Sequence, residues 1–161
     1  MPSPPLTPLA AAVLHVGRPE RILQVECGDG EGVLFLAREF PQARVRGVDR
    51  SAEAIRAASG RVGLDPEGRV VFKVGRPGAL PFPDDHFDCV AVLDASPPTA
   101  EIARVLRPAG SLVLAYSIRA KAPRGLRRGL LRWGLARARI DLVAEAAAGD
   151  GSFAVGHLRD G

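Results

Sequence analysis

Two glycines and an aspartate have the types and the spacing of a nucleotide-binding site. Gly28 and Gly30 follow the apolar run Ile22–Val25 and precede a segment with helical periodicity, and Asp49 ends a second apolar run nineteen residues after Gly30. Glycines between a strand and a helix let a ligand approach the backbone, where exposed N–H groups can meet a polar or anionic ligand. A carboxylate at the end of the next strand can accept hydrogen bonds from a ribose diol. The pattern predicts a cofactor that carries a ribose.

Alternating strand-like and helix-like segments must position these residues. The expected strands are Arg21–Val25, Ala43–Val48, Arg69–Val74, Phe87–Leu93, Gly110–Tyr116, Ile140–Ala147 and Ser152–Arg159. The expected helices are Leu9–Val16, Glu31–Phe40, a helix capped by Ser51 and running to Val62, Pro97–Leu106 and Pro123–Ala138. This alternation predicts an α/β fold: a doubly wound, Rossmann-like, mostly parallel sheet of seven strands that ends in an antiparallel hairpin strand. Residues 1–161 are expected to form a single domain.

The composition excludes several classes of protein. No apolar run approaches the roughly 20 residues that span a bilayer, and the N-terminal segment lacks the basic start of a signal peptide, so we expect a cytoplasmic protein with no membrane partner. Cys27 and Cys89 are too few for a disulfide framework or a thiolate metal site, and no metal is expected. The formal net charge is +4, and residues 117–139 carry eight basic side chains and no acidic one. The basicity therefore belongs to one segment.

A nicotinamide or flavin site requires the pattern G-x-G-x-x-G. Counted from Gly28, the third glycine falls on Val33. This departure disfavours a nicotinamide-dependent oxidoreductase.

Four blocks in order resemble the class I S-adenosylmethionine-dependent methyltransferases of the small ubiquinone/menaquinone-methyltransferase-like type. They are ILQVECGDG, VRGVDRS, ALPFPDDHFDCV and EIARVLRPAGSLVLAYS. The last is similar to the family's helix-to-strand corner E-x-x-R-V-L-K-P-G-G. The resemblance runs from about Ile22 to Tyr116, and the terminal hairpin suits the family's antiparallel seventh strand.

The resemblance implies S-adenosylmethionine as the cofactor and in-line transfer of its methyl group to an acceptor, with a general base needed only where the acceptor is poorly acidic. It places the methionine part against Cys27 and Gly28, the ribose at Asp49, and the adenine beside Arg50 and the Arg76–Pro77 turn. The full set of expected cofactor-binding residues is Gln24, Glu26, Cys27, Gly28, Gly30, Asp49, Arg50, Arg76, Pro77 and Leu93.

The cofactor loop departs from the family pattern at three positions. Gln24 stands at the acidic position and Glu26 at the first glycine position, where a side chain at positive φ is costly. The Glu26 carboxylate can replace the missing charge toward the cofactor's ammonium, or it can block the pocket. Arg76 replaces an acidic residue and cannot accept a hydrogen bond from adenine. A frame shifted by two residues, Glu26 to Gly32, restores the consensus but moves the apolar strand residues off their places, so we favour the unshifted frame.

Asp94, directly after the fourth expected strand, is the one candidate for a catalytic role, and a loop-capping role is the alternative. His15, His86 and His157 are interpreted as structural or surface residues, and Cys89 as a core residue.

The basic helix is expected to have two faces. Leu126, Leu130 and Trp133 should pack on the sheet, and three arginines should face solvent on the opposite side (Arg124, Arg128 and Arg132). The sharper alternative is an arginine face that docks nucleic acid or an acidic partner, and the scarcity of nearby aromatic residues disfavours nucleic acid.

The sequence therefore predicts a methyltransferase that acts on an unidentified small-molecule acceptor. Either the acceptor site is open, or a homo-oligomer or partner protein completes it. The alternative is a catalytically inactive methyltransferase-fold scaffold that docks a partner through its basic C-terminal helix.

Overall fold

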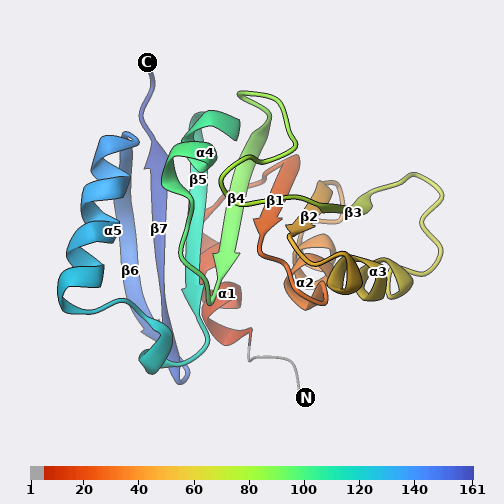
Figure 1. The fold of residues 1–161 in the computed structure, drawn as a ribbon, viewed down its shortest axis with the longest axis horizontal. Helices are drawn as coiled ribbons and strands as arrows, with labels where there is room; N and C mark the ends of the chain where they lie inside the picture. The colour runs from red at the N-terminus through yellow and green to blue at the C-terminus, as the bar shows by residue number, and fades with distance from the viewer. Residues whose placement is uncertain (1–5) are drawn as a thin grey trace.

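Seven strands form one mixed sheet in the order β3-β2-β1-β4-β5-β7-β6 (Figure 1). The computed structural model describes residues 6–161. Residues 1–5, which belong to the expected domain 1–161 and to the N-terminal segment examined for a signal peptide, lie outside the described residues. Strands β1 to β5 pair in parallel, whereas β7 is antiparallel to both β5 and β6. The order reverses between β1 and β4, which is where open α/β sheets bind ligands. The predicted fold class is confirmed.

Except at the start of β5, the strand bounds agree with the expected ones to within one residue. They are β1 Arg21–Val25, β2 Arg44–Asp49, β3 Val70–Val74, β4 Phe87–Leu93, β5 Leu106–Tyr116, β6 Ile140–Ala148 and β7 Gly151–Leu158. The expected Gly149-Asp150-Gly151 turn connects β6 to β7, and Gly149 has φ 57°. A positive φ at this turn is the conformation that glycine adopts most readily.

The helices begin and end within a few residues of expectation. They are α1 Thr7–Ala12, α2 Glu31–Glu39, α3 Ala52–Gly60, α4 Thr99–Val105 and α5 Gly125–Arg137, with short 3₁₀ turns at Val13–His15 and Arg119–Lys121. The expected cap of α3 is present, because the Ser51 hydroxyl accepts a hydrogen bond from the Ala54 amide at 3.1 Å. This bond satisfies one of the amide groups that a helix start leaves without a partner.

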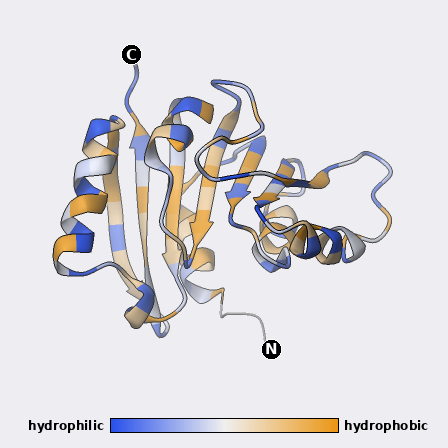
Figure 2. Cartoon of the chain, in the orientation of Figure 1, coloured by the Kyte–Doolittle hydropathy of each residue, from blue (hydrophilic) through white to orange (hydrophobic). Residues whose placement is uncertain are grey.

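Helices cover both faces of the sheet and bury two apolar clusters (Figures 1 and 2). Helices α1, α2 and α3 pack on one face, and α4 and α5 pack on the other. Successive residues of β1 alternate between the two clusters, as the period of two in a strand requires: Ile22 joins the first cluster and Leu23 the second. The centre of the sheet, where the glycine loop begins, is therefore covered on both faces.

The corner between α4 and β5 differs from the sequence prediction. The helix ends at Val105 and the strand begins at Leu106, although we expected the strand to begin at Gly110. Phe87 pairs with Leu106 and Cys89 pairs with Ser111, so the residues between Leu106 and Ser111 bulge out of the ladder. Ala109, at the first of the family's two glycine positions in this corner, has φ 65°. The following Gly110 is required, since a Cβ there would lie 2.8 Å from the Arg107 carbonyl oxygen.

The predicted sheet-facing stripe of the basic helix α5 is wrong. The side chains of Leu126, Leu130 and Trp133 are 80%, 58% and 61% exposed, whereas Leu135 is buried against the sheet. Leu131 packs beside it, so the stripe that faces the sheet lies one residue further along the helix. The three arginines expected on the solvent side, Arg124, Arg128 and Arg132, are all exposed, as predicted.

Two of those arginines lie close to the edge strand β6. Arg132 and Arg128 approach the Glu145 carboxylate of β6 at 3.1 and 4.0 Å. These ion pairs are exposed, and such pairs contribute little to stability. They do show that this side of α5 is turned toward the edge of the sheet.

Candidate functional site

The loop after β1 has the backbone of a ligand cradle. Gly28 and Gly30 have φ 53° and 87°, and Gly30 is the N-cap of α2. A Cβ at Gly30 would lie 2.7 Å from the Phe72 ring, so only glycine fits there. At Gly28 a Cβ would meet no atom within 4 Å, so its Cα faces open space. The loop thus presents uncovered backbone next to a helix N-terminus, as a nucleotide site requires.

Glu26 occupies the first glycine position with φ 58°. An L-residue in the left-handed region costs about 1–2 kcal/mol relative to its usual conformation. The Glu26 carboxylate accepts a hydrogen bond from the Arg50 guanidinium at 2.8 Å, which joins the ends of β1 and β2. The charge of this carboxylate is therefore directed toward Arg50, across the start of the cradle.

Asp49 connects β2 to the glycine loop. Its Oδ2 accepts a hydrogen bond from the Gly28 amide at 2.9 Å, and its Oδ1 accepts one from the Ser51 amide at 2.9 Å. The residue is only 9% exposed. A carboxylate has about four acceptor positions, so two remain for a ligand. Asp49 both shapes the loop and keeps capacity for further hydrogen bonds.

Gln24 has a buried side-chain oxygen that forms no hydrogen bond with any group of residues 6–161. The residue is 2% exposed, and its Oε1 has no hydrogen bond. The side chain lies against Gly32 in the first turn of α2, where a Cβ would be 2.4 Å from Oε1. An unsatisfied buried acceptor costs about 1–3 kcal/mol. Such an atom next to a ligand cradle can accept a hydrogen bond from a donor that enters the cradle.

The other expected cofactor residues lie along the same edge of the sheet. Arg76 and Pro77 follow β3, and Arg76 is exposed and forms an isolated bridge with Ala79. Leu93 ends β4 and is half-buried. Cys27 is 5% exposed, and burial raises the pKa of its thiol to about 12, so it is a small packing residue and not a nucleophile.

Asp94 has a structural partner for each carboxylate oxygen. Its Oδ1 accepts from the Ser117 amide at 2.7 Å and its Oδ2 from the Ser117 hydroxyl at 2.6 Å, and the Lys121 ammonium lies 3.4 Å from Oδ2. These bonds tie the end of β4 to the segment after β5. These bonds agree with the loop-capping alternative for Asp94, and they take three of the roughly four acceptor positions of its carboxylate.

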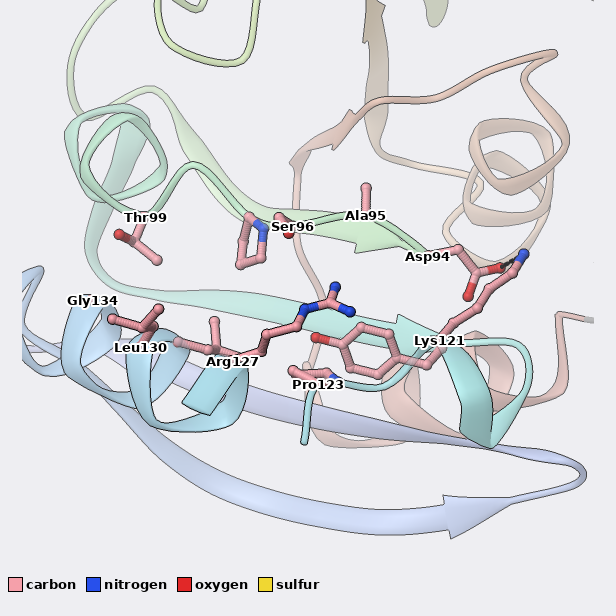
Figure 3. Close-up of a pocket in the computed structure, with 12 residues that line it drawn as sticks. Asp94, Ala95, Ser96, Thr99, Lys121, Pro123, Arg127, Leu130 and Gly134 are labelled. Carbon is pink, nitrogen blue, oxygen red and sulfur yellow. Dashed lines mark hydrogen bonds and ion pairs between the residues drawn. The ribbon is translucent and has the colours of Figure 1, made fainter. Parts of the chain in front are cut away.

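A cavity of about 560 Å³ opens beside Asp94, between the carboxyl ends of β4 and β5 and helix α5 (Figure 3). We call it the β4–α5 cavity. It is lined by Asp94, Ala95, Ser96, Pro97, Thr99, Tyr116, Lys121, Pro123, Arg127, Leu130, Leu131 and Gly134. Its size is typical of pockets that hold small organic molecules.

Sequence reasoning missed most of this cavity. It assigned Leu130 to the sheet-facing side of a basic helix, gave Arg127 no role beyond the basic segment 117–139, and gave Tyr116 only the end of a strand. The signal available was the short connection from Asp94 to α4, which leaves the end of β4 uncovered until α5 folds over it. No local pattern identifies which side of α5 does so.

Comparison with known proteins agrees with this architecture. Residues 22–110, more than half of the chain, match the family described as "Methyltransferase domain". The chain therefore belongs to the methyltransferase-domain family, and its fold is that of a class I S-adenosylmethionine-dependent methyltransferase. The cofactor that this membership implies is S-adenosylmethionine.

Two curated relatives illustrate the match. The ubiquinone/menaquinone biosynthesis C-methyltransferase UbiE of Geobacter sulfurreducens is 35% identical over 103 residues, which are 58% of this chain and 40% of that protein. The 27-O-demethylrifamycin SV methyltransferase of Amycolatopsis mediterranei is 33% identical over 129 residues, which are 75% of this chain and 47% of that protein. The chain thus spans less than half the length of these two curated relatives.

A solved structure from Haloferax volcanii, described as a complex between the Trm112 methyltransferase activator and a methyltransferase, has the same fold. It superposes with a TM-score of 0.78 at 18% identity and covers 96% of this chain and 90% of that chain. At this identity the likeness shows the fold alone.

Residues 6–161 contain no group of three or more His, Cys, Asp or Glu side chains arranged to hold a metal ion. No helix within the described part of the chain is long and apolar enough to cross a membrane.

Proposed function

We propose that this chain transfers a methyl group from S-adenosylmethionine to a small-molecule acceptor bound in the β4–α5 cavity. The supporting observation is the position of the cavity at the same edge of the sheet as the glycine loop. Val25 of β1 pairs with Val92 of β4 in parallel. Glu26, which follows β1, and the Leu93–Asp94 turn at the end of β4 therefore lie side by side. A cofactor on the loop and an acceptor in the cavity would meet at the ends of β1 and β4.

The relatives support the acceptor class. The Geobacter protein is named for ubiquinone/menaquinone biosynthesis, and the Amycolatopsis protein for 27-O-demethylrifamycin SV. Both names refer to small molecules, and we extend that class to this chain.

The residues present fit the cofactor. The unsatisfied Oε1 of Gln24 would accept a hydrogen bond from the ammonium of the methionine part, at the position where the family pattern has an acidic residue. Gly28 and Gly30 would allow this part to lie against the backbone. Asp49 would use its remaining acceptor positions for the ribose hydroxyls.

The adenine would lie beside Arg50 and the Arg76–Pro77 turn. Arg76 offers no acceptor to the adenine amino group, so recognition there would depend on backbone carbonyls and on stacking. The ion pair of Arg50 with Glu26 would hold the arginine in place at this edge. Among the expected cofactor residues, Glu26, Cys27 and Leu93 would form the walls of the cofactor site without a hydrogen bond to the cofactor.

S-adenosylmethionine supplies a methyl group on a positively charged sulfur, which is already activated for transfer. The chain would therefore contribute mainly alignment and exclusion of water. Asp94 would act as a positioning residue, because its bonds to Ser117 and Lys121 fix the wall between cradle and cavity.

Calorimetric titration with S-adenosylhomocysteine tests the cofactor site. The wild-type protein is expected to bind this product in the micromolar range. Gln24→Leu removes a hydrogen bond to a charged group and should weaken binding about ten-fold, which corresponds to ~1.4 kcal/mol. The same substitution removes a buried orphan acceptor, so the free energy of unfolding should stay constant or rise.

Arg127→Gln is the matched control, because Arg127 lines the acceptor cavity and not the cradle. It should leave the affinity for S-adenosylhomocysteine unchanged. A wild-type protein that unfolds cooperatively and yet binds neither S-adenosylhomocysteine nor S-adenosylmethionine would refute the proposed function. Normal binding by Gln24→Leu would refute only the role given to Gln24.

A second candidate function, partner binding by a catalytically inactive methyltransferase fold, is favoured by one observation. Leu126, Leu130 and Trp133 form an exposed apolar stripe on α5. Exposed apolar surface of this kind often marks an interaction site. This function would be supported by two results together. The folded wild-type protein would fail to bind the cofactor, and its sedimentation coefficient would fall when Leu126→Asp and Trp133→Asp are introduced.

A further inference from the structure

The β4–α5 cavity contains one cation that has no acidic partner among the described residues. Lys121 and Asp94 lie 3.4 Å apart and balance each other. Arg127 forms no ion pair within residues 6–161, and it extends from α5 into the cavity toward the end of β4 (Figure 3). The wall of the cavity therefore carries a net positive charge from a guanidinium, which is the side chain best shaped to bind an oxyanion.

A hydroxyl donor accompanies this cation. Burial raises the pKa of Tyr116, and the nearby charge of Arg127 opposes that shift only in part. Tyr116 therefore stays protonated at neutral pH and can donate a hydrogen bond. No hydrogen bond to another residue of the described chain uses its hydroxyl. Arg127 and Tyr116 together offer donors to one anionic group.

The remainder of the wall is mainly apolar. Pro97 lies on the β4 side, and Leu130 and Leu131 lie on the α5 side. Leu130 is 58% exposed, so it forms the rim through which an apolar chain or ring can enter. An occupant that satisfies the whole cavity has one anionic end and an apolar body.

From these features we infer that the acceptor is an amphipathic organic carboxylate, held by Arg127 and Tyr116 at its anionic end and by Pro97, Leu130 and Leu131 along its apolar body. This inference rests on the proposed function. A phosphate monoester carries between one and two negative charges at neutral pH, which a single uncompensated cation would leave unbalanced. A carboxylate carries one.

The chemistry of transfer agrees with a carboxylate. The lining residues include no histidine or glutamate, and Ser117 and Lys121 take three of the roughly four acceptor positions of Asp94. This lining suits an acceptor that needs no base better than an alcohol or a carbon acid, which must lose a proton. A carboxylic acid with an ordinary pKa near 4 is already ionised at pH 7. Its oxygen forms the new bond to the methyl carbon as the carbon–sulfur bond breaks, and the electron pair of that bond stays on sulfur. The products are a neutral methyl ester and a neutral thioether, and no proton is released.

Calorimetric titration with matched acids and alcohols tests this inference. The probes are octanoate and 4-phenylbutyrate, compared with 1-octanol and 4-phenyl-1-butanol, each with and without saturating S-adenosylhomocysteine. The wild-type protein is expected to bind at least one acid about ten-fold more tightly than its alcohol, since a charge-assisted hydrogen bond is lost in the alcohol. Arg127→Gln should abolish most of that preference.

Arg137→Gln is the control, because Arg137 lies on the same helix, stacks on Trp133 at 5.3 Å and does not line the cavity. It should change the acid affinities less than two-fold. Equal binding of acid and alcohol, absence of acid binding, or an acid preference that survives Arg127→Gln would each overturn the inference. Binding of S-adenosylhomocysteine is measured separately in the same samples. A protein that binds S-adenosylhomocysteine but shows no acid preference refutes only the carboxylate acceptor, whereas a folded protein that binds no cofactor refutes the proposed function.

Discussion

The corner between α4 and β5 provides a direct test of the backbone conformation. Ala109 has φ 65° and its side chain is exposed, so Ala109→Gly removes one methyl group that buries little surface. The left-handed conformation costs an L-residue about 1–2 kcal/mol, and glycine returns about 0.4–1 kcal/mol of that through the greater entropy of its unfolded chain. The variant should therefore be more stable than the wild type by about 0.5–1 kcal/mol.

Thermal and urea denaturation measure this difference. A chain of 161 residues has an unfolding entropy of about 0.34 kcal/mol per kelvin, so the melting temperature should rise by ~2–3 °C. The control is Ala57→Gly, an exposed site in the middle of α3, where glycine should cost about 1 kcal/mol and lower the melting temperature by ~3 °C. Opposite signs at the two sites are the expected result. An Ala109→Gly protein that melts at or below the wild-type temperature would refute the positive φ at this corner.

Two further predictions concern titratable groups. Burial raises the pKa of the Cys27 and Cys89 thiols to about 12, so neither should react with iodoacetamide at pH 8 in the native protein, and both should react in urea. Rapid native alkylation, read by mass spectrometry, would contradict their burial. The hydrogen bond from Arg104 lowers the pKa of Glu101 below its ordinary 4.5, so its contribution to stability is present above pH 4.5 and is lost as the pH falls through the lowered value. Urea titrations should show a steeper acid loss in the wild type than in Arg104→Gln, and parallel curves would exclude this contribution.

Much of the fold could be predicted because its signals are local. The bounds of β1 and β4 were predicted to the residue, since both strands are apolar runs covered on two faces. The Ser51 cap and the glycine turn before β7 were equally readable, because a side-chain acceptor and a positive φ each identify a particular backbone conformation.

The orientation of α5 could not be predicted for a reason visible in its own residues. Leu126, Leu130 and Trp133 follow helical spacing, and Leu131 with Leu135 follows the same spacing one residue later. Both stripes satisfy the rule for a helix that packs on a sheet. Only the contact of Leu135 with the second apolar cluster selects between them.

The cofactor loop could be predicted from the sequence, whereas the β4–α5 cavity could not. The glycine loop, Asp49 and the winding of the strands follow from the sequence by itself, because each depends on residues close together in the chain. The tertiary structure alone directs the Glu26 carboxylate to Arg50, leaves the Oε1 of Gln24 without a partner, and brings Arg127 and Tyr116 to the end of β4. These arrangements depend on packing between elements distant in the chain, and that packing decides which polar groups are satisfied and which remain for a ligand.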